Sequence, residues 1–359
     1  MSNWKDKSTS VRKGEELDQA ALEQYLLNHL PNAEGELVIE QFPGGFSNLT
    51  YLIRLGEQQL VLRRPPFGAK IKSAHDMSRE YNILSSLMKI YDKVPRPLLF
   101  CEDESVLGAE FYVMERLHGV ILRPKMPKEM HPKPELMKAI SKELIQTFAD
   151  YHNLDYKAAG LENFGKPNGY VERQIKGWSK RYYKSQTDDL PDIEFAIKWL
   201  NDNIRPESGV SLIHNDYKYD NVVLDEKDWS KIVAILDWEM ATLGDPLMDL
   251  GTSVGYWINP NDPPAMQMMQ LNSTTIEGNP TREEVVHQYA LVSGREVGDF
   301  IFHYVYGLFK IAVIVQQIYY RYKHGYTNDK RFAGLIHAVK ACGQMAKQAI
   351  QKKKIDNLY

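Results

Sequence analysis

The feature that most constrains the fold is the uneven distribution of strand-like and helical patterns along the chain. Strand-like runs concentrate in the first third, at residues 37–39, 50–55, 59–63 and 111–114. Gly44-Gly45 and Gly56-Glu57 separate the first three runs, which predicts an antiparallel meander. Beyond Gly119 the apolar residues recur at helical spacing, and only 222–224 and 232–236 still resemble strands. The sequence therefore predicts an α+β protein with a small sheet-rich lobe and a larger helical lobe.

The same patterns divide the chain into three regions. Residues 1–35 are expected to form a polar leader and then a helix over 15–30. Residues 36–117 are expected to form the small N-terminal lobe, which includes a helix over 73–87, and residues 118–359 the large C-terminal lobe. The main helices of the large lobe are predicted at 136–152, 171–183, 193–203, 282–293, 298–322 and 331–352.

The composition is that of a globular protein without a polyanionic partner. The formal net charge is -3 and 43% of the residues are hydrophobic, so the chain has enough apolar mass for a core and no overall positive field. The first seven residues lack the apolar stretch of a signal peptide. The most apolar region, 300–320, contains His303 and Lys310, and we expect a buried helix there rather than a membrane span. We therefore expect a cytoplasmic protein that binds neither nucleic acid nor membrane; its oligomeric state is left open.

The strongest chemical signal is the segment from His214 to Asn221, followed by Asp237 after a strand-like run. An Asp and an Asn five residues apart, with a second Asp sixteen residues on, suit phosphoryl transfer, which depends on positioning and charge stabilisation. Asn221 and Asp237 would supply the oxygen ligands that Mg²⁺ prefers. Asp216 would orient an acceptor hydroxyl and take its proton, and Lys218 would reach the transferring phosphate.

The same residue types also form turns, and a lone His-x-Asp would favour that interpretation. The complete pattern of His-x-Asp-x-x-x-x-Asn, a hairpin and a further Asp instead resembles the catalytic and metal-binding loops of protein kinases. Its form here, with Gly244 to Leu250 after it, resembles the aminoglycoside phosphotransferase and choline kinase family. Segments 164–178 and 318–322 resemble phosphotransferase family proteins similar to the kinase-like domain fused to some acyl-CoA dehydrogenases. The resemblance implies a bilobal protein-kinase-like fold that binds ATP and Mg²⁺.

The resemblance also implies a phosphate-binding loop in the small lobe. Two strands are joined there by a loop that contains Gly44, Gly45, Ser47 and Asn48. The two glycines let the backbone approach an anion closely, and the two polar side chains can donate hydrogen bonds. Taken alone, such a loop is usually only a turn.

Arg63 ends a strand where the family has its phosphate-contacting Lys, and Glu80, seventeen residues on, would be its ion-pair partner. An Arg keeps the positive charge and offers a planar fork to phosphate oxygens, although its geometry differs from that of Lys. Arg64 is the alternative occupant, but strand alternation turns it away if Arg63 faces inward. The competing interpretation is a solvated strand-end Arg and an exposed helical Glu.

The resemblance places the inter-lobe hinge at Met114 to Leu117. The backbone groups of Glu115 and Leu117 would bond the adenine edge, with Met114 behind it. Asp249 resembles the family's buried carboxylate that braces the catalytic loop. Structural rather than chemical roles are expected for Asp245, His214 and His152.

The acceptor is the least constrained part of the function. The segments expected to line its pocket are basic, with Arg123, Lys125, Lys128, Arg173, Lys176, Lys180, Arg181 and Lys184. Such a pocket would disfavour aminoglycosides, which are polycations, and would favour an acceptor with carboxylate or phosphate groups. The subgroup resemblance implies a hydroxyacyl-CoA. The alternative is that these charges simply form a solvated helix face.

The sequence thus predicts an ATP- and Mg²⁺-dependent small-molecule kinase that phosphorylates a hydroxyl acceptor. One alternative is a catalytically silent nucleotide-binding protein of the same fold, which Arg63 in place of Lys would suit. Another is an aminoglycoside- or choline-type kinase. A protein kinase is disfavoured, because Gly244-Asp245-Pro246 follows Asp237 too soon for a long activation segment. ATP and GTP are not distinguished.

Overall fold

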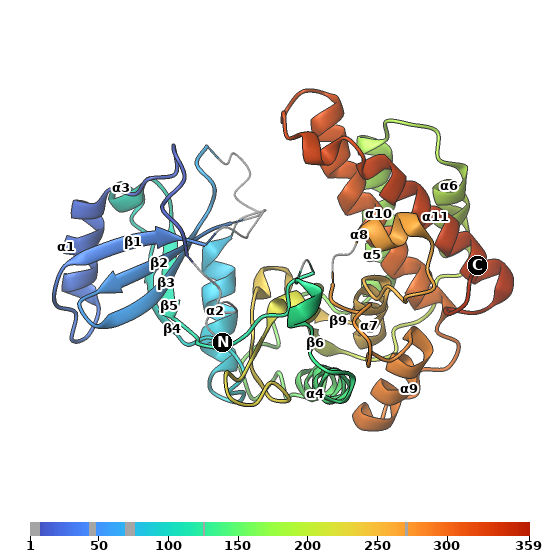
Figure 1. The fold of residues 1–359 in the computed structure, drawn as a ribbon, viewed down its shortest axis with the longest axis horizontal. Coiled ribbons are helices and arrows are strands. Elements are labelled where there is room, and N and C mark those ends of the chain that lie inside the picture. The colour runs from blue at the N-terminus through green and yellow to red at the C-terminus, as the bar shows by residue number, and fades with distance from the viewer. Residues whose placement is uncertain (1–7, 43–47, 69–75, 125, 270–271) are drawn as a thin grey trace. The chain divides into compact units, whose positions relative to one another are not determined.

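The computed structural model describes residues 8–42, 48–68, 76–124, 126–269 and 272–359 (Figure 1). The chain forms two compact units. The first contains Met1–Ile121, Lys157–Leu161 and Val222–Met240, and the second contains Leu122–Tyr156, Glu162–Asn221 and Ala241–Tyr359. A sheet-rich first unit and a helical second unit confirm the predicted α+β class.

The first unit is built on a five-stranded antiparallel sheet with strand order β1-β2-β3-β5-β4. The strands are β1 (Leu37–Gln41), β2 (Leu49–Leu55), β3 (Gln58–Arg64), β4 (Pro97–Cys101) and β5 (Phe111–Glu115). The predicted meander is confirmed, because β1 pairs with β2 and β2 with β3. Gly56 makes the β2–β3 turn with a positive φ of 55°, a conformation that side chains with a Cβ avoid.

Helices cover this sheet at two places. α1 (Gln19–His29) is capped by Asp18, whose carboxylate accepts the backbone N–H of Ala21, and buries Leu22 and Leu26 in the core beside β2 and β3. α2 (Met77–Leu87) is capped by Asp76 and packs against β4 and β5. α3 (Glu104–Leu107) is a single turn against α1. A side-chain oxygen at each cap satisfies an N–H that the helix itself cannot.

The hairpin β7 (Val222–Leu224) and β8 (Ile232–Ile235) also packs within the first unit. Leu224 pairs with Val120, and the Ile235 N–H donates to the carbonyl of Lys93. The short helix η4 (Trp238–Met240) then contacts α2. This grouping differs from the predicted division at residue 117, which assigned the hairpin to the large lobe because it comes later in the chain.

The second unit is mostly helical. Its helices are α4 (Pro134–His152), α5 (Tyr170–Ser185), α6 (Pro191–Asp202), α7 (Pro246–Gly255), α8 (Pro264–Met269), α9 (Arg282–Ser293), α10 (Ile301–Lys323) and α11 (Leu335–Lys352), with 3-10 turns η2 (Lys128–Met130), η3 (Tyr219–Asn221) and η5 (Lys330–Phe332). The two-stranded pair β6 (Ser211–Ile213) and β9 (Thr242–Gly244) was not predicted. The interpretation that the second half holds only two strand-like runs was therefore wrong, since three-residue strands are too short to show a period. β4 was missed because Pro97 begins it, and Pro is found in strands mainly at an edge or first position.

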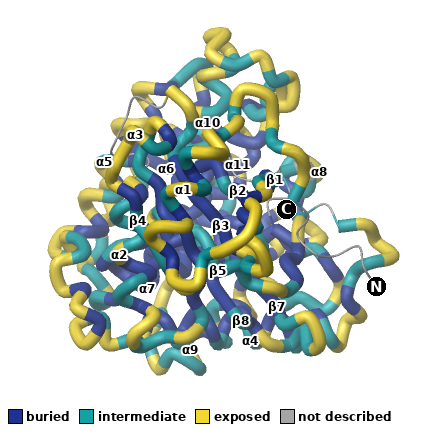
Figure 2. Tube along the Cα trace, turned by 90° about the vertical axis from the view of Figure 1, so that its left-hand side faces the viewer, coloured by how far each residue is buried: buried dark blue, intermediate teal, exposed yellow. Residues whose placement is uncertain are grey.

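α7 and α10 cross with their backbones in direct contact. A Cβ on Gly307 would overlap the carbonyl oxygen of Gly251, and one on Gly251 would overlap that of His303. α10 is long and apolar enough to span a membrane, but 83% of its most apolar window is buried among the described residues (Figure 2). It is the buried helix that the sequence predicts at this position.

Candidate active site

The predicted catalytic loop follows β6 in the second unit and positions Asp216 through two neighbours. The Nζ of Lys218 lies 2.8 and 2.7 Å from the two carboxylate oxygens of Asp216. The Nδ2 of Asn221 donates to the Asp216 carbonyl and to Oδ2, both at 2.9 Å. The carboxylate is therefore held by a cation and an amide within its own loop.

These contacts show which atoms and charges of Asn221 and Lys218 remain available to a ligand. Because Asn221 uses its Nδ2 on Asp216, its Oδ1 is the atom left to bind a cation. Burial lowers the pKa of Lys218, but Asp216, Tyr256 and Asp220 together raise it by more, so the net shift is upward and Lys218 stays a cation. Burial raises the pKa of Tyr256, with Asp216 adding to the shift, and the Tyr256 ring lies 4.9 Å from the Lys218 ammonium.

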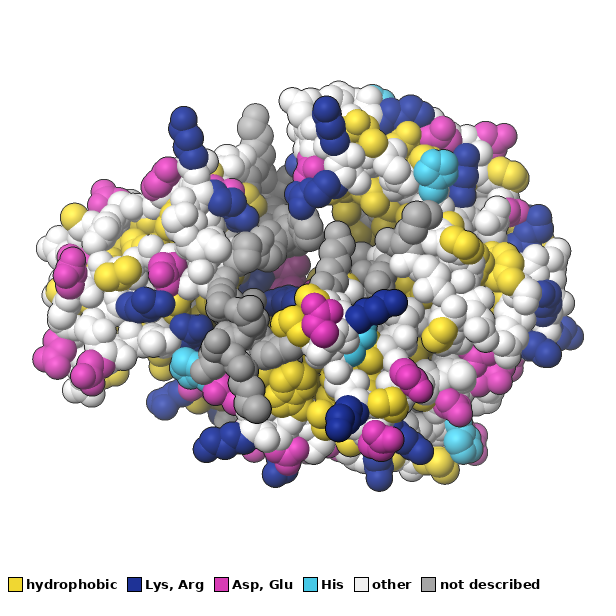
Figure 3. Space-filling model, in the orientation of Figure 1, with side chains coloured by type: hydrophobic (Ala, Val, Ile, Leu, Met, Phe, Trp, Pro, Cys, Tyr) yellow, Lys and Arg dark blue, Asp and Glu magenta, His cyan; other side chains and the backbone are white. Residues whose placement is uncertain are grey.

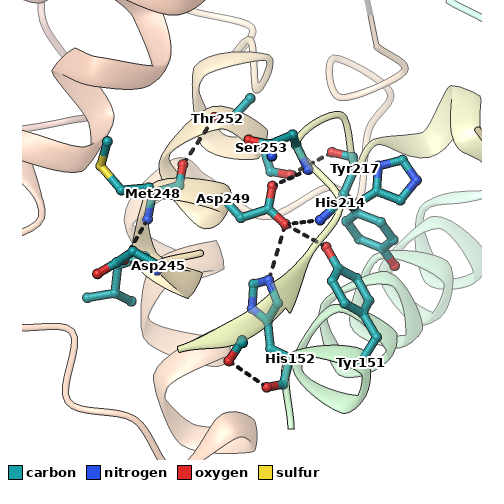
Figure 4. Close-up of polar contacts among 12 residues, drawn as sticks. Tyr151, His152, His214, Tyr217, Asp245, Met248, Asp249, Thr252 and Ser253 are labelled. Carbon is teal, nitrogen blue, oxygen red and sulfur yellow. Dashed lines mark hydrogen bonds and ion pairs between the residues drawn. The ribbon is translucent and has the colours of Figure 1, made fainter. Parts of the chain in front are cut away.

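Asp249 in α7 braces this loop from behind (Figure 4). Its carboxylate accepts the backbone N–H of His214 at 2.7 Å and that of Asn215 at 2.8 Å. It also accepts from the Tyr151 hydroxyl at 3.0 Å and from His152 Nε2 at 3.2 Å. Burial raises the pKa of Asp249, but the His152 hydrogen bond and the other donors bring the net shift below its usual value. Asp249 is thus a buried anion with four donors, the arrangement that a bracing carboxylate requires.

The two histidines of this region have structural partners. Burial lowers the pKa of His152, and its Nδ1 lies 2.7 Å from the Tyr289 hydroxyl. Neutral His152 can therefore accept from Tyr289 and donate to Asp249. His214 Nδ1 accepts the backbone N–H of Asp216 at 3.2 Å. Asp245 caps α7 by accepting the N–H groups of Leu247 and Met248. His152, His214 and Asp245 thus make contacts of the structural kind expected.

In the first unit, Arg63 gathers three carboxylates. Its guanidinium lies 2.6 Å from Glu80 in α2, 2.9 Å from Asp237 after β8, and 3.7 Å from Glu239. Glu239 also accepts a hydrogen bond of 2.8 Å from Asn48 Nδ2. The Arg63–Glu80 pair spans β3 and α2, the elements that carry the Lys–Glu ion pair in protein kinases.

Burial and ion pairing have opposite effects on the pKa values of this cluster. Burial raises the pKa of Glu80 to about 7, although Arg63 opposes the shift. Burial alone would lower the pKa of Arg63, but Glu80 and the other acids hold it above its usual value. Among the described side chains, Arg63 pairs with all three of these acids, so its charge serves more than one carboxylate. Asp237 also has a positive φ of 67°, a conformation uncommon for a residue with a side chain and concentrated at functional sites.

The remaining residues predicted for the nucleotide site are partly outside the described residues and partly at the end of β5 and just after it. Gly44, Gly45 and Ser47 lie outside the described residues. Glu115 ends β5 and exchanges hydrogen bonds with Arg96, with its N–H donating to the Arg96 carbonyl at 2.9 Å. Leu117 is partly buried against the cluster that contains Val223. The structure therefore brings Lys218 and Asn221 together around Asp216 in the second unit, and Glu80 and Asp237 around Arg63 in the first. Glu115 and Leu117 belong to neither set.

The basic residues predicted near the acceptor are largely solvated. All five on α5 are exposed: Arg173, Lys176, Lys180, Arg181 and Lys184. Lys176 pairs with Glu172 on the same helix, and Arg181 stacks on Trp178 at 4.5 Å. On the face drawn in Figure 3, basic and acidic side chains are interspersed rather than gathered in one patch. Arg123 pairs with Asp220 at 2.7 Å, Lys128 is exposed, and Lys125 lies outside the described residues. These positions match the alternative interpretation of a solvated face.

Three residues of these sets were not assigned a role from the sequence. Glu239 is an acid of the Arg63 cluster, and its place two residues after Asp237 was the available signal. Tyr256 lies beside Lys218, and Lys310 in α10 donates to the Asn215 carbonyl at 2.9 Å. A Lys inside the most apolar segment of the chain was itself a signal, because buried charges are rare unless they have a function.

The donor chemistry fits Mg²⁺ better than a transition metal. Among the described residues, no group of three or more His, Cys, Asp and Glu side chains is arranged to hold a metal ion. Mg²⁺ needs only one or two protein oxygens, because it keeps several waters and substrate phosphates as ligands. The Asp237 carboxylate and the Asn221 Oδ1 are oxygen donors of this kind.

Comparison with known proteins gives consistent matches. The family model described as "Phosphotransferase enzyme family" matches residues 38–283. Acyl-CoA dehydrogenase family member 10 of Mus musculus is 35% identical over 314 residues, which cover 87% of this chain but 29% of that protein. A crystal structure from Ralstonia eutropha, provisionally named an aminoglycoside phosphotransferase, matches with a TM-score of 0.79 and 30% identity, covering 94% of this chain and 99% of that one.

A more distant solved structure shares the fold. The ternary complex of aminoglycoside phosphotransferase APH(4)-Ia with AMP-PNP and hygromycin B matches with a TM-score of 0.59 and 15% identity, over 94% of this chain and 99% of that one. The present chain thus spans a solved kinase-like chain almost completely, whereas it spans less than a third of the dehydrogenase relative.

Proposed function

The chain belongs to the phosphotransferase enzyme family. We propose that it is an ATP- and Mg²⁺-dependent kinase acting on the hydroxyl group of a small anionic metabolite. The observation that carries the proposal is the Asp216 carboxylate, held by Lys218 and Asn221 in the loop after β6. This is the side chain that a kinase of this fold needs as its base.

In the proposed reaction the acceptor O–H donates its hydrogen bond to Asp216, which takes the proton as the oxygen bonds to the γ-phosphorus. The bond from that phosphorus to the β–γ bridging oxygen breaks, and ADP leaves with its electron pair. Lys218 stays cationic beside Asp216 and offers positive charge to the transferring group. Mg²⁺, when bound through Asn221 and Asp237, would neutralise phosphate charge.

Arg63 is proposed as the phosphate-contacting cation of the nucleotide site. Its ion pair with Glu80 orients the guanidinium, as the corresponding Glu does for Lys in protein kinases. An Arg in this role keeps its charge at every relevant pH and can contact two oxygens at once. Binding of AMP-PNP by APH(4)-Ia and of GDP by aminoglycoside 2'-phosphotransferase-IIIa supports a purine nucleotide as the donor, and we propose ATP.

For the acceptor we propose a hydroxyacyl-CoA. The support is the match to a segment of an acyl-CoA dehydrogenase family member, because a kinase segment joined to a dehydrogenase segment would act on related acyl compounds. The exposed basic residues of α5 give this choice little support, since they point to solvent.

The test is ADP release from Mg-ATP, and in parallel GDP release from Mg-GTP, across a panel of acceptors. The panel contains hydroxyacyl-CoAs, choline-type alcohols, hydroxy amino acids, sugars and aminoglycosides. We expect turnover of about 1–100 per second on hydroxyacyl-CoA, abolished by Asp216→Asn. Asp220→Asn is the matched control, because Asp220 is a carboxylate of the same loop that pairs with Arg123 rather than with Asp216 or Lys218; it should keep activity.

Unchanged turnover in Asp216→Asn would overturn the role of Asp216. Turnover on an aminoglycoside or choline-type alcohol alone would replace the acceptor while leaving the reaction type in place. Mg-ATP binding without ADP release on any acceptor would favour the catalytically silent alternative.

A further inference from the structure

Lys310 is a buried cation that the proposed reaction does not use. It lies in the middle of α10 with 1% of its surface exposed. Its Nζ donates to the backbone carbonyl of Asn215 at 2.9 Å and to the Asn215 Oδ1 at 3.1 Å. Both bonds end on the residue that directly precedes Asp216.

The peptide group between Asn215 and Asp216 is held at both of its polar atoms, by Lys310 at the carbonyl and by His214 at the N–H. The carbonyl oxygen accepts from Lys310, and the N–H of Asp216 donates to His214 Nδ1 at 3.2 Å. Asn215 has a positive φ of 68°, a conformation that needs support from its surroundings. Tyr170 adds to this support by donating to Asn215 Oδ1 at 3.3 Å. The orientation of this peptide decides where the Asp216 side chain leaves the backbone.

A carboxylate on a second helix, Asp249 in α7, also holds the loop. Asp249 in α7 accepts the N–H groups of His214 and Asn215, while Lys310 in α10 donates to the carbonyl of Asn215. The two helices cross in backbone contact at Gly251 and Gly307. Asp249 precedes one glycine by two residues and Lys310 follows the other by three, so the crossing sets the distance between the two groups that hold the loop.

Burial opposes the charge that Lys310 carries. It lowers the pKa of Lys310 to about 8, against the attraction of Asp249 in α7 and Asp216 in the loop. Lys218 in the loop and Arg181 in α5 repel the ammonium and lower the pKa further. An apolar residue would suit the surrounding core better, so a Lys at this position indicates a role in function rather than in stability.

We propose that Lys310 is a positioning residue that orients the Asp216 carboxylate through the Asn215–Asp216 peptide. The inference rests on the proposed function, because it takes Asp216 as the base. Lys310 differs in this role from a residue that only fills the core. Its hydrogen bonds hold the catalytic loop, although burial disfavours its charged form.

The variants are Lys310→Met, which removes the donor and the charge, and Lys310→Arg, which keeps both. Gln316→Met is the matched control, because Gln316 is a buried polar residue of the same helix that bonds Ser185 and Thr187 instead of the loop. In Lys310→Met we expect kcat to fall by about 10²-fold with a small change in KM, since a misplaced reacting group costs about this much. We expect kcat to be retained in Gln316→Met and largely restored in Lys310→Arg.

The pH profile of kcat is the readout that a purely structural role would not move, and amide hydrogen exchange, compared with the matched control, shows whether the effect is confined to the loop. The kcat of the unaltered protein should fall as the pH rises through about 8, and in Lys310→Arg this fall should move to higher pH, because Arg stays charged. Amides of residues 212–221 should exchange faster in Lys310→Met than in Gln316→Met. If Lys310→Met does not fold, Lys310→Gln, which keeps a donor without the charge, replaces it in both measurements.

Equal kcat, pH profile and loop exchange in the Lys310 and Gln316 variants would overturn the inference. If the unaltered protein shows no turnover on any acceptor, the proposed function fails separately. The hydrogen exchange of residues 212–221 then decides on Lys310 alone. Faster exchange only in Lys310→Met supports its orienting role on the loop, and equal exchange in the two variants refutes it.

Discussion

The guanidinium of Arg63 lies 2.6 Å from the carboxylate of Glu80, and both side chains are almost fully buried, at 10% and 1% exposure. Arg63 also reaches Asp237 at 2.9 Å. A single Arg on β3 therefore connects α2 to the residue that follows β8, and it is the ion-pair partner of a Glu80 carboxylate that is almost fully buried.

Removing that cation should strongly destabilise the protein. Arg63→Met leaves Glu80 buried without its partner, and breaking a buried pair in this way costs about 3–5 kcal/mol. Arg54→Met is the control, because Arg54 forms an ion pair of similar length with Glu40 on the same sheet but is 43% exposed; it should cost about 0–1 kcal/mol. Urea unfolding of the two variants measures the difference. Equal losses would show that Arg63 does not carry the charge balance of this cluster.

Asp249→Asn should cost more than its small change in shape suggests. The new amide group keeps one acceptor oxygen but places a donor against the donors that now bind Asp249, which include the N–H groups of His214 and Asn215. We expect a loss of about 3 kcal/mol or more in unfolding free energy, together with loss of turnover. Asp245→Asn keeps an oxygen for the N–H groups of Leu247 and Met248 at the α7 cap and sets its amide against one further N–H, that of Ser208. It should therefore cost less, about 1–2 kcal/mol. A milder effect at Asp249 than at Asp245 would contradict the bracing role.

Gly307→Ala tests the contact between α7 and α10. The added Cβ would overlap the carbonyl of Gly251, so the helices must separate, and we expect a loss of about 1–3 kcal/mol. Gly334→Ala is the control, because nothing lies within 4 Å of a Cβ at that position, and it should stay within about 0.5 kcal/mol of the unaltered protein. Thermal unfolding compares the two. A stable Gly307→Ala variant would mean that the crossing tolerates a wider spacing.

His303 should make the protein less stable in acid. Burial lowers its pKa to about 4, aided by Arg205. Between about pH 6.5 and 4 the unfolded chain therefore binds a proton that the folded protein does not, and the stability falls as the pH falls through this window. A shift of this size corresponds to about 3 kcal/mol. His303→Phe should show a flatter dependence of unfolding free energy on pH than the unaltered protein.

The control for this prediction is His287→Gln on α9, where the side chain is exposed; it should leave the pH dependence as it is. Parallel curves for His303→Phe and the unaltered protein would show that His303 does not contribute to acid sensitivity.

The sequence determined the fold class and the main elements, because periods of two and 3.6 residues are set locally by which face of an element is buried. Spacing along the chain also placed Asp216, Lys218 and Asn221 in one loop, where the structure joins their side chains. Strand alternation separated the two neighbouring arginines: Arg63 pairs with Glu80, whereas Arg64 stacks on Phe67 at 3.8 Å.

Tertiary structure alone decided which distant residues meet. Asn48 and Glu239 are 191 positions apart, and Lys310 and Asn215 are 95 apart, yet each pair is hydrogen-bonded. The three-residue strands β6 and β9 also form only as a pair. Local periodicity tells which side of an element is buried but not which element covers it, because that choice is made by packing and by the need to pair every buried charge and donor.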